Sequence, residues 1–311
     1  MSGPIIRIEH LSRSFGAVKA LDDLSLEVPA GIVFGFLGPN GAGKTTTIHL
    51  LLGLLEPTEG QASVMGFDSR TQAGAIRARS GALLEFAGLY ERMSAEDNLE
   101  LYGRIYHMPA PARRARIKEL LTHLDLWERR LDQVGTWSRG MKQKLAVARA
   151  LFHHPQLVFL DEPTAGFDPV AAAALREDLA SLVAREGVTL FLNTHNLTEA
   201  EKLCAQVAVI RQGKLLAVGA PDALGGGLGG SQAEIVGEGF TEQMLTPLRE
   251  QPEVLHAELQ DNHLLIELRG ERKLAPLVRL LVNAGASVEE VRKGKANLEE
   301  VFLTLMEEGS K

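Results

Sequence analysis

The sequence predicts an α/β protein with a mostly parallel core sheet, an antiparallel edge sheet, a helical insert and a small C-terminal α+β domain. Three features carry this prediction. Alternating apolar and polar residues open the chain, continuous apolar runs recur through its middle, and a glycine-rich stretch precedes a second series of strands and helices. Alternation is typical of half-exposed antiparallel strands, whereas continuous apolar runs are typical of parallel strands that are buried on both faces.

The antiparallel edge sheet is predicted from residues 5–28 and 61–67. Residues 5–28 contain two runs with a period of two, which favours a pair of strands, and residues 61–67 favour a further short strand. Phe15 lies between the two runs. It is either a core residue or, since it stands near a turn ahead of a glycine-rich loop, an aromatic ring on which a nucleobase stacks.

A phosphate-binding loop is predicted after the edge strands. Gly38–Thr45 fit the pattern G-x-x-x-x-G-K-[ST], and Thr46 follows it. The nine residues of the stretch are Gly38, Pro39, Asn40, Gly41, Ala42, Gly43, Lys44, Thr45 and Thr46. The apolar run at 32–37 predicts a buried strand before the loop, and residues 46–55 predict a helix after it. This strand and helix are the context that the motif requires.

The residue types in the loop explain its chemistry. The glycines let consecutive backbone N–H groups curl around phosphate oxygens, and the N-terminus of the following helix favours anions. Lys44 can reach the β- and γ-phosphates, and the hydroxyl of Thr45 can bind Mg²⁺. Together they predict a site for a nucleoside triphosphate.

Polar residues also end two further apolar runs. Leu157–Leu160 is followed by Asp161 and Glu162, and the run at 188–192 is followed by His195. Two adjacent carboxylates at the end of a buried strand are costly unless they bind something. We expect Asp161 to hold Mg²⁺ and Glu162 to polarise an attacking water. His195 is a catalytic candidate because ligands gather at the carboxyl ends of parallel strands.

Helices are predicted between the strands. A helical insert is expected over about 86–153, with a capping box at Ser94 and Asp97, and a further helix is expected over 171–186. The clustered basic residues of the insert are predicted to form a solvated helix face; they are Arg113, Arg114 and Arg116.

The chain is predicted to divide at its glycine-rich stretch. Residues 225–231 are predicted to be a flexible linker between residues 1–224 and residues 232–311. The last part predicts strand 232–237, helix 241–250, strand 253–259, strand 262–268, helix 272–284, strand 286–292 and helix 297–307. The order β-α-β-β-α-β with one added helix is ferredoxin-like. This part shows no catalytic constellation, which favours an accessory module for interaction or dimerisation.

Composition narrows the classes of function. The net charge is −7, and residues 220–311 carry all of the excess, with 16 acidic and 9 basic residues. A basic nucleic-acid-binding face is therefore not expected, so nucleic acid is not predicted as a partner. A single cysteine excludes an internal disulfide and favours a reducing compartment. The sequence contains no apolar stretch of about 18 residues, so no bilayer-spanning helix is predicted.

Taken in order, these motifs resemble the ATP-binding subunit of an ABC transporter over residues 5–220. The resemblance implies a P-loop NTPase core of ABC type that binds ATP with Mg²⁺ and hydrolyses it to drive transport. It further implies that Phe15 stacks on the adenine and that His195 senses the γ-phosphate. Lys44 and Glu162 would complete the catalytic set.

The resemblance also implies a dimer in which two copies enclose two ATP molecules head to tail. Trp137–Met141 falls at the signature of the family, usually Leu-Ser-Gly-Gly-Gln, where Ser138 and Gly140 keep the residues that touch phosphate on the other copy. Residues 166–169 resemble the loop that contacts the opposite subunit. The family commonly places Gln after the second strand of the core sheet, and Glu85 stands there as an expected Mg²⁺ ligand.

These departures, together with residues 88–90 and the ending at 297–305, resemble one branch of the family. That branch contains multidrug, antibiotic-resistance and sodium exporters whose membrane permease is a separate polypeptide. It implies a peripheral location on the cytoplasmic face of the inner membrane. The alternatives are a soluble ABC ATPase in translation or DNA repair and a regulatory protein that holds ATP without hydrolysing it. The single cassette, the acidic excess and the presence of Glu162 and His195 weigh against them.

Overall fold

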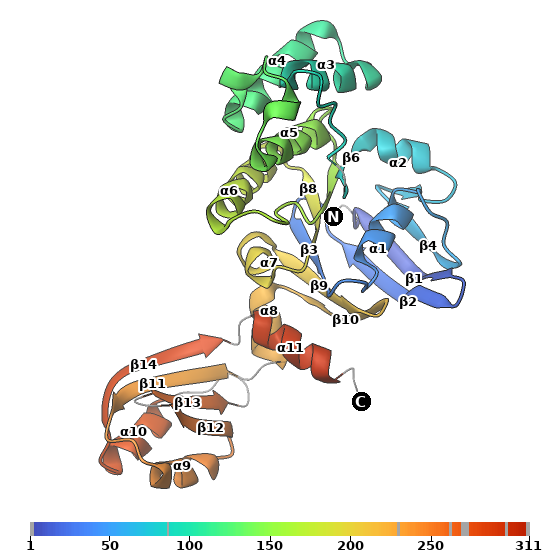
Figure 1. Ribbon diagram of the computed structural model, residues 1–311. Helices are drawn as coiled ribbons and strands as arrows, with labels where there is room; N and C mark the ends of the chain where they lie inside the picture. The colour runs from blue at the N-terminus through green and yellow to red at the C-terminus, as the bar shows by residue number, and fades with distance from the viewer. Residues whose placement is uncertain are drawn as a thin grey trace. The chain divides into compact units, whose positions relative to one another are not determined.

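The computed structural model describes residues 3–85, 87–228, 231–260, 263–268, 274–295 and 298–308. The chain divides into two compact units, Met1–Ala217 and Val218–Lys311 (Figure 1). Each unit has its own cluster of buried apolar side chains. The α/β class predicted from the sequence is confirmed.

A six-stranded sheet forms the centre of the first unit, in the order β10-β9-β3-β8-β7-β6. Its strands are β3 (Val33–Leu37), β6 (Ser80–Leu83), β7 (Leu157–Asp161), β8 (Thr189–Thr194), β9 (Gln206–Arg211) and β10 (Lys214–Gly219). Strand β3 pairs in parallel with β8 and β9, and β7 pairs in parallel with β6 and β8. Every residue of β3, β7 and β8 is buried or nearly so, which explains their continuous apolar sequences. The ring of Phe191 lies 5.3 to 5.8 Å from three neighbouring phenylalanine rings.

An antiparallel sheet in the order β2-β1-β4-β5 lies beside the core sheet in the same unit. It consists of β1 (Ile6–Phe15), β2 (Val18–Val28), β4 (Glu59–Val64) and β5 (Phe67–Asp68). The pair predicted over residues 5–28 is confirmed. The strand predicted over 61–67 is confirmed only up to Val64, because Met65 and Gly66 have positive φ angles and turn the chain between β4 and β5.

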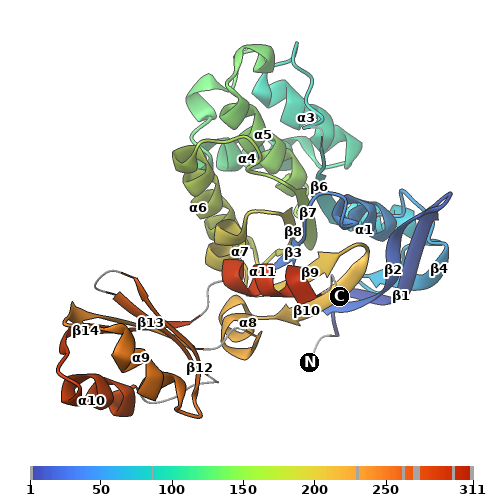
Figure 2. The same ribbon diagram turned by 60° about the horizontal axis from the view of Figure 1, so that its bottom comes forward.

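The remaining elements of the first unit are helical. They are α1 (Lys44–Leu51), α2 (Ala73–Arg79), α3 (Ala95–Ile105), α4 (Ala110–His123), α5 (Arg139–Leu151), α6 (Pro169–Glu186) and α7 (Leu197–Leu203), with 3₁₀ turns at Trp127–Arg129 and Val134–Thr136. The helices α3, α4 and α5 form the predicted insert and lie together at one end of the unit in both views (Figure 2). The predicted cap of α3 is confirmed, since the Oγ of Ser94 accepts the backbone N–H of Asp97 at 3.0 Å.

The solvated basic face predicted for α4 is wrong for two of its three arginines. Arg114 is exposed, but Arg113 is largely covered and pairs with Glu100 of α3 at 2.8 Å, and Arg116 is only 2% exposed. Sequence spacing places these residues on one helix without revealing which neighbouring helices cover it.

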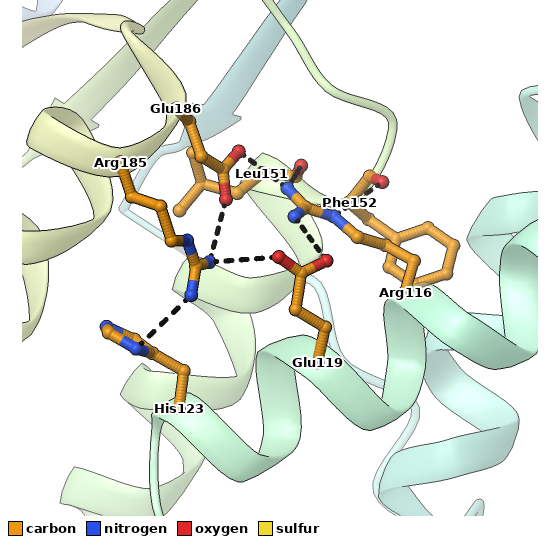
Figure 3. A network of polar contacts seen from close by, with 7 residues as sticks. All are labelled: Arg116, Glu119, His123, Leu151, Phe152, Arg185 and Glu186. Carbon is orange, nitrogen blue, oxygen red and sulfur yellow. Dashed lines mark hydrogen bonds and ion pairs between the residues drawn. The ribbon is translucent and has the colours of Figure 1, made fainter.

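Arg116 joins three helices through one buried guanidinium group (Figure 3). It donates to the carbonyl oxygens of Leu151 and Phe152, at the end of α5, at 2.8 and 3.4 Å. It also pairs with Glu186 at the end of α6 at 2.7 Å and with Glu119 of its own helix at 3.0 Å. The last carbonyl groups of a helix have no partner within the helix, so a buried donor satisfies them.

The second unit contains a four-stranded antiparallel sheet in the order β12-β13-β11-β14. Its elements are α8 (Pro221–Leu228), β11 (Ser231–Glu238), α9 (Glu242–Arg249), β12 (Val254–Gln260), β13 (His263–Leu268), α10 (Ala275–Asn283), β14 (Ser287–Lys295) and α11 (Leu298–Glu308). Apolar residues of the strands and of α9 and α10 share one core. The sequence of strands and helices predicted for this part is confirmed.

The flexible linker predicted over residues 225–231 is wrong over most of its length. Helix α8 continues through Leu228 and β11 begins at Ser231, while residues 229–230 lie outside the described residues. Glycine costs about 1 kcal/mol relative to alanine in a helix interior. However, α8 packs against α11 and β14, and packing commonly outweighs propensity.

Candidate active site

The predicted phosphate loop lines an open cleft of about 350 Å³ in the first unit. The lining residues come from β1, β2, the loop before α1, the first turn of α1, and the end of β7 with the residue after it. They are Phe15, Ala20, Pro39, Asn40, Gly41, Ala42, Gly43, Lys44, Thr45, Thr46, Asp161 and Glu162. The fold therefore brings together residues from three separate parts of the sequence.

The backbone of the loop adopts conformations that favour glycine. Gly41 and Gly43 have φ angles of 78° and 105°. A Cβ atom on Gly43 would lie 2.5 Å from the carbonyl oxygen of Ala20, so β2 packs directly against the loop. Gly38 has a similar limit, because a Cβ atom there would lie 2.5 Å from the carbonyl oxygen of Ile210. These close approaches fix the loop between the edge sheet and the core sheet.

Lys44 is the first residue of α1 and is only 7% exposed. Its Nζ donates to the carbonyl oxygen of Gly38 at 2.8 Å and lies 3.4 Å from that of Pro39. The ammonium group thus folds back over its own loop. A cation in this place can neutralise phosphate oxygens that the loop binds.

Asp161 joins the phosphate loop to two strands. Its Oδ2 accepts the hydroxyl of Thr45 at 2.7 Å, and its Oδ1 accepts the side-chain amide of Asn193 on β8 at 3.2 Å. The predicted proximity of Thr45 and Asp161 is therefore observed. Asn193 was not predicted, because a buried Asn inside an apolar strand carries no recognisable motif.

Glu162 contacts both other candidate catalytic residues. Its Oε1 lies 3.5 Å from the Nζ of Lys44, and its Oε2 lies 2.9 Å from the Nδ1 of His195. Its backbone has a φ angle of 50°, in the left-handed region, and its N–H donates to the carbonyl oxygen of Asn193. Such a conformation is costly for a non-glycine residue and is often found at functional sites.

Phe15 ends β1 at the rim of the cleft. The core alternative is excluded, because the side chain is 45% exposed and lines the cleft. The guanidinium carbon of Arg13 lies 4.6 Å from the centre of the Phe15 ring. Arg13 is itself held by the backbone carbonyl of Glu56 at 2.8 Å. Arg13 was not predicted.

Five predicted site residues are not among those that line the cleft. Two of them, Gly38 and His195, contact residues that line it, and the other three are Ser138, Gly140 and Glu85. Ser138 caps α5, and its Oγ accepts the backbone N–H of Met141 at 3.3 Å. Gly140 faces the ring of Phe167, in the segment predicted to contact another subunit. Glu85 is exposed on the bend after β6, and its assignment as a Mg²⁺ ligand stays a prediction.

Comparison with known proteins identifies the family. The sequence pattern described as "ABC transporter" matches residues 21–165. The chain is 37% identical to the daunorubicin resistance ATP-binding protein DrrA3 of Streptomyces coeruleorubidus, over 98% of this chain and 96% of that protein. This chain belongs to the ABC transporter family.

Further relatives from this family agree. The bacitracin transport ATP-binding protein BcrA of Bacillus licheniformis is 40% identical over 68% of each chain. The Nod factor export ATP-binding protein I of Cupriavidus metallidurans is 36% identical over 97% of each chain. A solved structure described as the ATP binding subunit of an ABC transporter has a TM-score of 0.64 and 31% identity, covering 71% of this chain and 91% of that chain.

As a member of the ABC transporter family, this chain binds ATP and hydrolyses it in a reaction coupled to transport. The alternative of an ATPase without a transport role is not favoured, since the relatives are named for resistance, transport or export. Among the described residues, we find no helix that combines the length and the apolar character needed to span a bilayer.

Proposed function

We propose that this chain powers export of a substrate through a membrane permease that is a separate polypeptide. Relatives that match nearly its whole length are named for daunorubicin resistance and Nod factor export, and the bacitracin transport protein matches two thirds of it. The subunit would bind the cytoplasmic face of the membrane through that permease. The observation that carries the proposal is the cleft in which a phosphate loop meets Asp161 and Glu162, with His195 paired to Glu162.

The oxygen atoms near the phosphate loop fit a Mg²⁺ ion. Thr45 and Asp161 offer a hydroxyl and a carboxylate 2.7 Å apart, and Mg²⁺ prefers a few such ligands together with phosphate and water oxygens. When bound, the ion would neutralise charge that develops on the β- and γ-phosphates. Asn193 would keep the Asp161 carboxylate in the required orientation through its amide.

Glu162 would act as the base for hydrolysis. It would accept the proton of a water whose oxygen bonds to the γ-phosphorus as the bond to the β–γ bridging oxygen breaks. Lys44 would stabilise the charge on the γ-phosphate oxygens from the loop side, and His195 would hold the Glu162 carboxylate and contact the same phosphate. The distances of 3.5 and 2.9 Å from Glu162 support this arrangement. Phe15 would hold the adenine through one ring face.

Two copies of the chain would share each nucleotide. Ser138 and Gly140, at the start of α5, lie outside the cleft of their own chain, so they are free to meet the phosphates held by a second copy. Backbone N–H groups in the first turn of a helix suit such an anion. The residues after 224 would serve as an accessory domain for interaction or dimerisation, since no catalytic residues are predicted among them.

The experiment that tests this proposal uses Glu162→Gln. The amide keeps size and hydrogen bonding but removes the base, so ATP should bind while hydrolysis slows by about 100-fold or more. ATP trapped in this way should hold two copies together, and light scattering should detect a dimer that dissociates in ADP.

Ser138→Arg is the matched change on the opposite side of the proposed interface. Added to Glu162→Gln, it should abolish the ATP-dependent dimer by filling the shared site. A double variant that dimerises as well as Glu162→Gln would contradict the role given to Ser138. The measurement is made with the permease present, so that a missing dimer cannot be attributed to the absence of the membrane partner.

A further inference from the structure

A buried carboxyl group lies beside the candidate active site without belonging to it. Glu199 is on α7, just after the turn that carries His195, and its side chain is fully buried. A buried carboxyl costs free energy that an apolar side chain of similar size does not cost. Packing alone therefore does not explain a glutamate at this position.

Hydrogen bonds from Glu199 close the turn around His195. The hydroxyl of Thr194, the last residue of β8, donates to the Oε2 of Glu199 at 2.8 Å. The same hydroxyl oxygen accepts the backbone N–H of Asn196 at 3.0 Å, and the Oδ1 of Asn196 accepts the backbone N–H of Glu199 at 3.0 Å. These three bonds surround His195, whose Nδ1 lies 2.9 Å from Glu162. The conformation that holds the imidazole beside Glu162 thus depends on the Glu199 carboxyl.

The second oxygen of this carboxyl faces the segment that follows Glu162. The Oε1 of Glu199 is buried and has no hydrogen-bond partner of standard geometry among the described residues. Burial raises the pKa of Glu199, although the side chains of Thr194 and Thr164 act in the opposite direction. Thr164 is two residues beyond Glu162, so the carboxyl lies between the two segments that carry the hydrolytic pair.

We propose that Glu199 is a positioning residue for ATP hydrolysis. Its carboxyl holds Thr194 and so fixes the turn that presents His195 to Glu162. This role rests on the proposed functions of Glu162 and His195, and Glu199 itself touches neither nucleotide nor water. The role requires a hydrogen-bond acceptor of this shape and does not require a negative charge.

Three variants test the role in the full chain. Glu199→Gln keeps the acceptor and the shape, Glu199→Leu fills the space without an acceptor, and Thr194→Val removes the same bond from its donor side. We expect Glu199→Leu and Thr194→Val each to lower kcat about tenfold, because small misplacements of catalytic groups are costly. The KM for ATP should be unchanged in both variants, and Glu199→Gln should retain most of the rate. The melting temperature of Glu199→Leu should not fall, whereas that of Thr194→Val should fall, because it leaves the Glu199 carboxyl buried without this donor and removes the acceptor of the Asn196 N–H. The double variant should be no slower than the slower single variant, since both single variants remove the bond between Thr194 and Glu199.

A wild-type kcat in a folded Glu199→Leu variant would overturn the proposal. So would a Glu199→Gln variant as slow as Glu199→Leu, because charge would then matter instead of the hydrogen bond. If Glu199→Leu does not fold, the Thr194→Val variant tests the proposal by itself, and an unchanged kcat in that variant overturns it. Failure of the proposed catalytic roles has a different signature, namely a wild-type rate in Glu162→Gln.

Discussion

Replacing Arg116 with alanine is expected to destabilise the first unit strongly. The guanidinium is 2% exposed and its partner Glu186 is 12% exposed, so the pair is buried and solvent screening is small. Breaking a buried ion pair by removing one partner costs about 3–5 kcal/mol, because the other charge is left buried alone. For a domain of this size, each kcal/mol lowers Tm by about 2–4 °C, so Arg116→Ala should lower it by about 6–20 °C.

Intrinsic fluorescence measures this loss selectively, because Trp127 and Trp137, the two tryptophans of the chain, are both in the first unit. Arg104→Ala is the matched control. Arg104 also pairs with a glutamate at 2.9 Å, but it is 68% exposed, and exposed pairs contribute about 1 kcal/mol or less. The reasoning would be refuted if Arg116→Ala and Arg104→Ala had the same Tm. It would also be refuted if added salt abolished the difference in Tm between wild type and Arg116→Ala, because salt screens exposed pairs far more than buried ones.

Acid should weaken the same network. Burial acts to raise the pKa of Glu186, but the hydrogen bonds and charges of Arg116 and Arg185 outweigh it and leave the pKa below its usual value of 4.5. A carboxyl with a lowered pKa in the folded state contributes stability above its unfolded pKa and loses it as pH falls through the folded value. The stability difference between wild type and Arg116→Ala should therefore shrink as pH falls below about 4.5.

Three further predictions follow from the site and its surroundings. Lys44→Ala should lower ATP turnover by about 100-fold or more, since it removes the cation of the phosphate loop, and a wild-type rate of phosphate release would contradict the site. Arg13→Ala should weaken ATP binding about threefold in calorimetry but leave inorganic tripolyphosphate unaffected, because the guanidinium rests on the Phe15 ring. An equal loss of affinity for ATP and for tripolyphosphate would exclude a role of Arg13 in binding the adenine. The His153 ring stacks on Tyr106, and burial lowers the pKa of His153 to about 4 from 6.5. The free energy of unfolding that this neutral ring contributes is therefore lost as pH falls from 6.5 toward 4. His153→Phe should lose less of its free energy of unfolding between pH 6.5 and pH 4 than wild type does, as measured by urea titrations at both pH values.

The sequence predicted those parts of the site that local chain geometry determines. The phosphate loop is a contiguous motif between a strand and a helix. Asp161 ends a buried strand, and Glu162 and His195 each follow one. Parallel strands bring their carboxyl ends to one edge of the sheet. Once the strands are recognised, the residues at their carboxyl ends are therefore expected to lie close together. Asn193 and Glu199 could not be predicted, because their roles depend on which strand and which turn lie opposite them.

The errors in the fold have the same origin. Residues 61–67 carry the composition of a strand, but positive φ angles at two positions divide them. Arg116 looks like a surface residue on its own helix and becomes buried only when the ends of α5 and α6 are placed beside it. The glycines of α8 favour a loop by propensity, and the helix forms against a partner near the end of the chain.

Because α8 forms against α11, helix α11 stabilises a segment about 70 residues before it in the sequence. A segment with three consecutive glycines has little tendency to form a helix by itself, so packing against α11 stabilises α8. During synthesis, residues 221–228 therefore emerge well before the helix that orders them. Helix α8, the first element of the second unit, therefore reaches its folded state only after α11 has been synthesised.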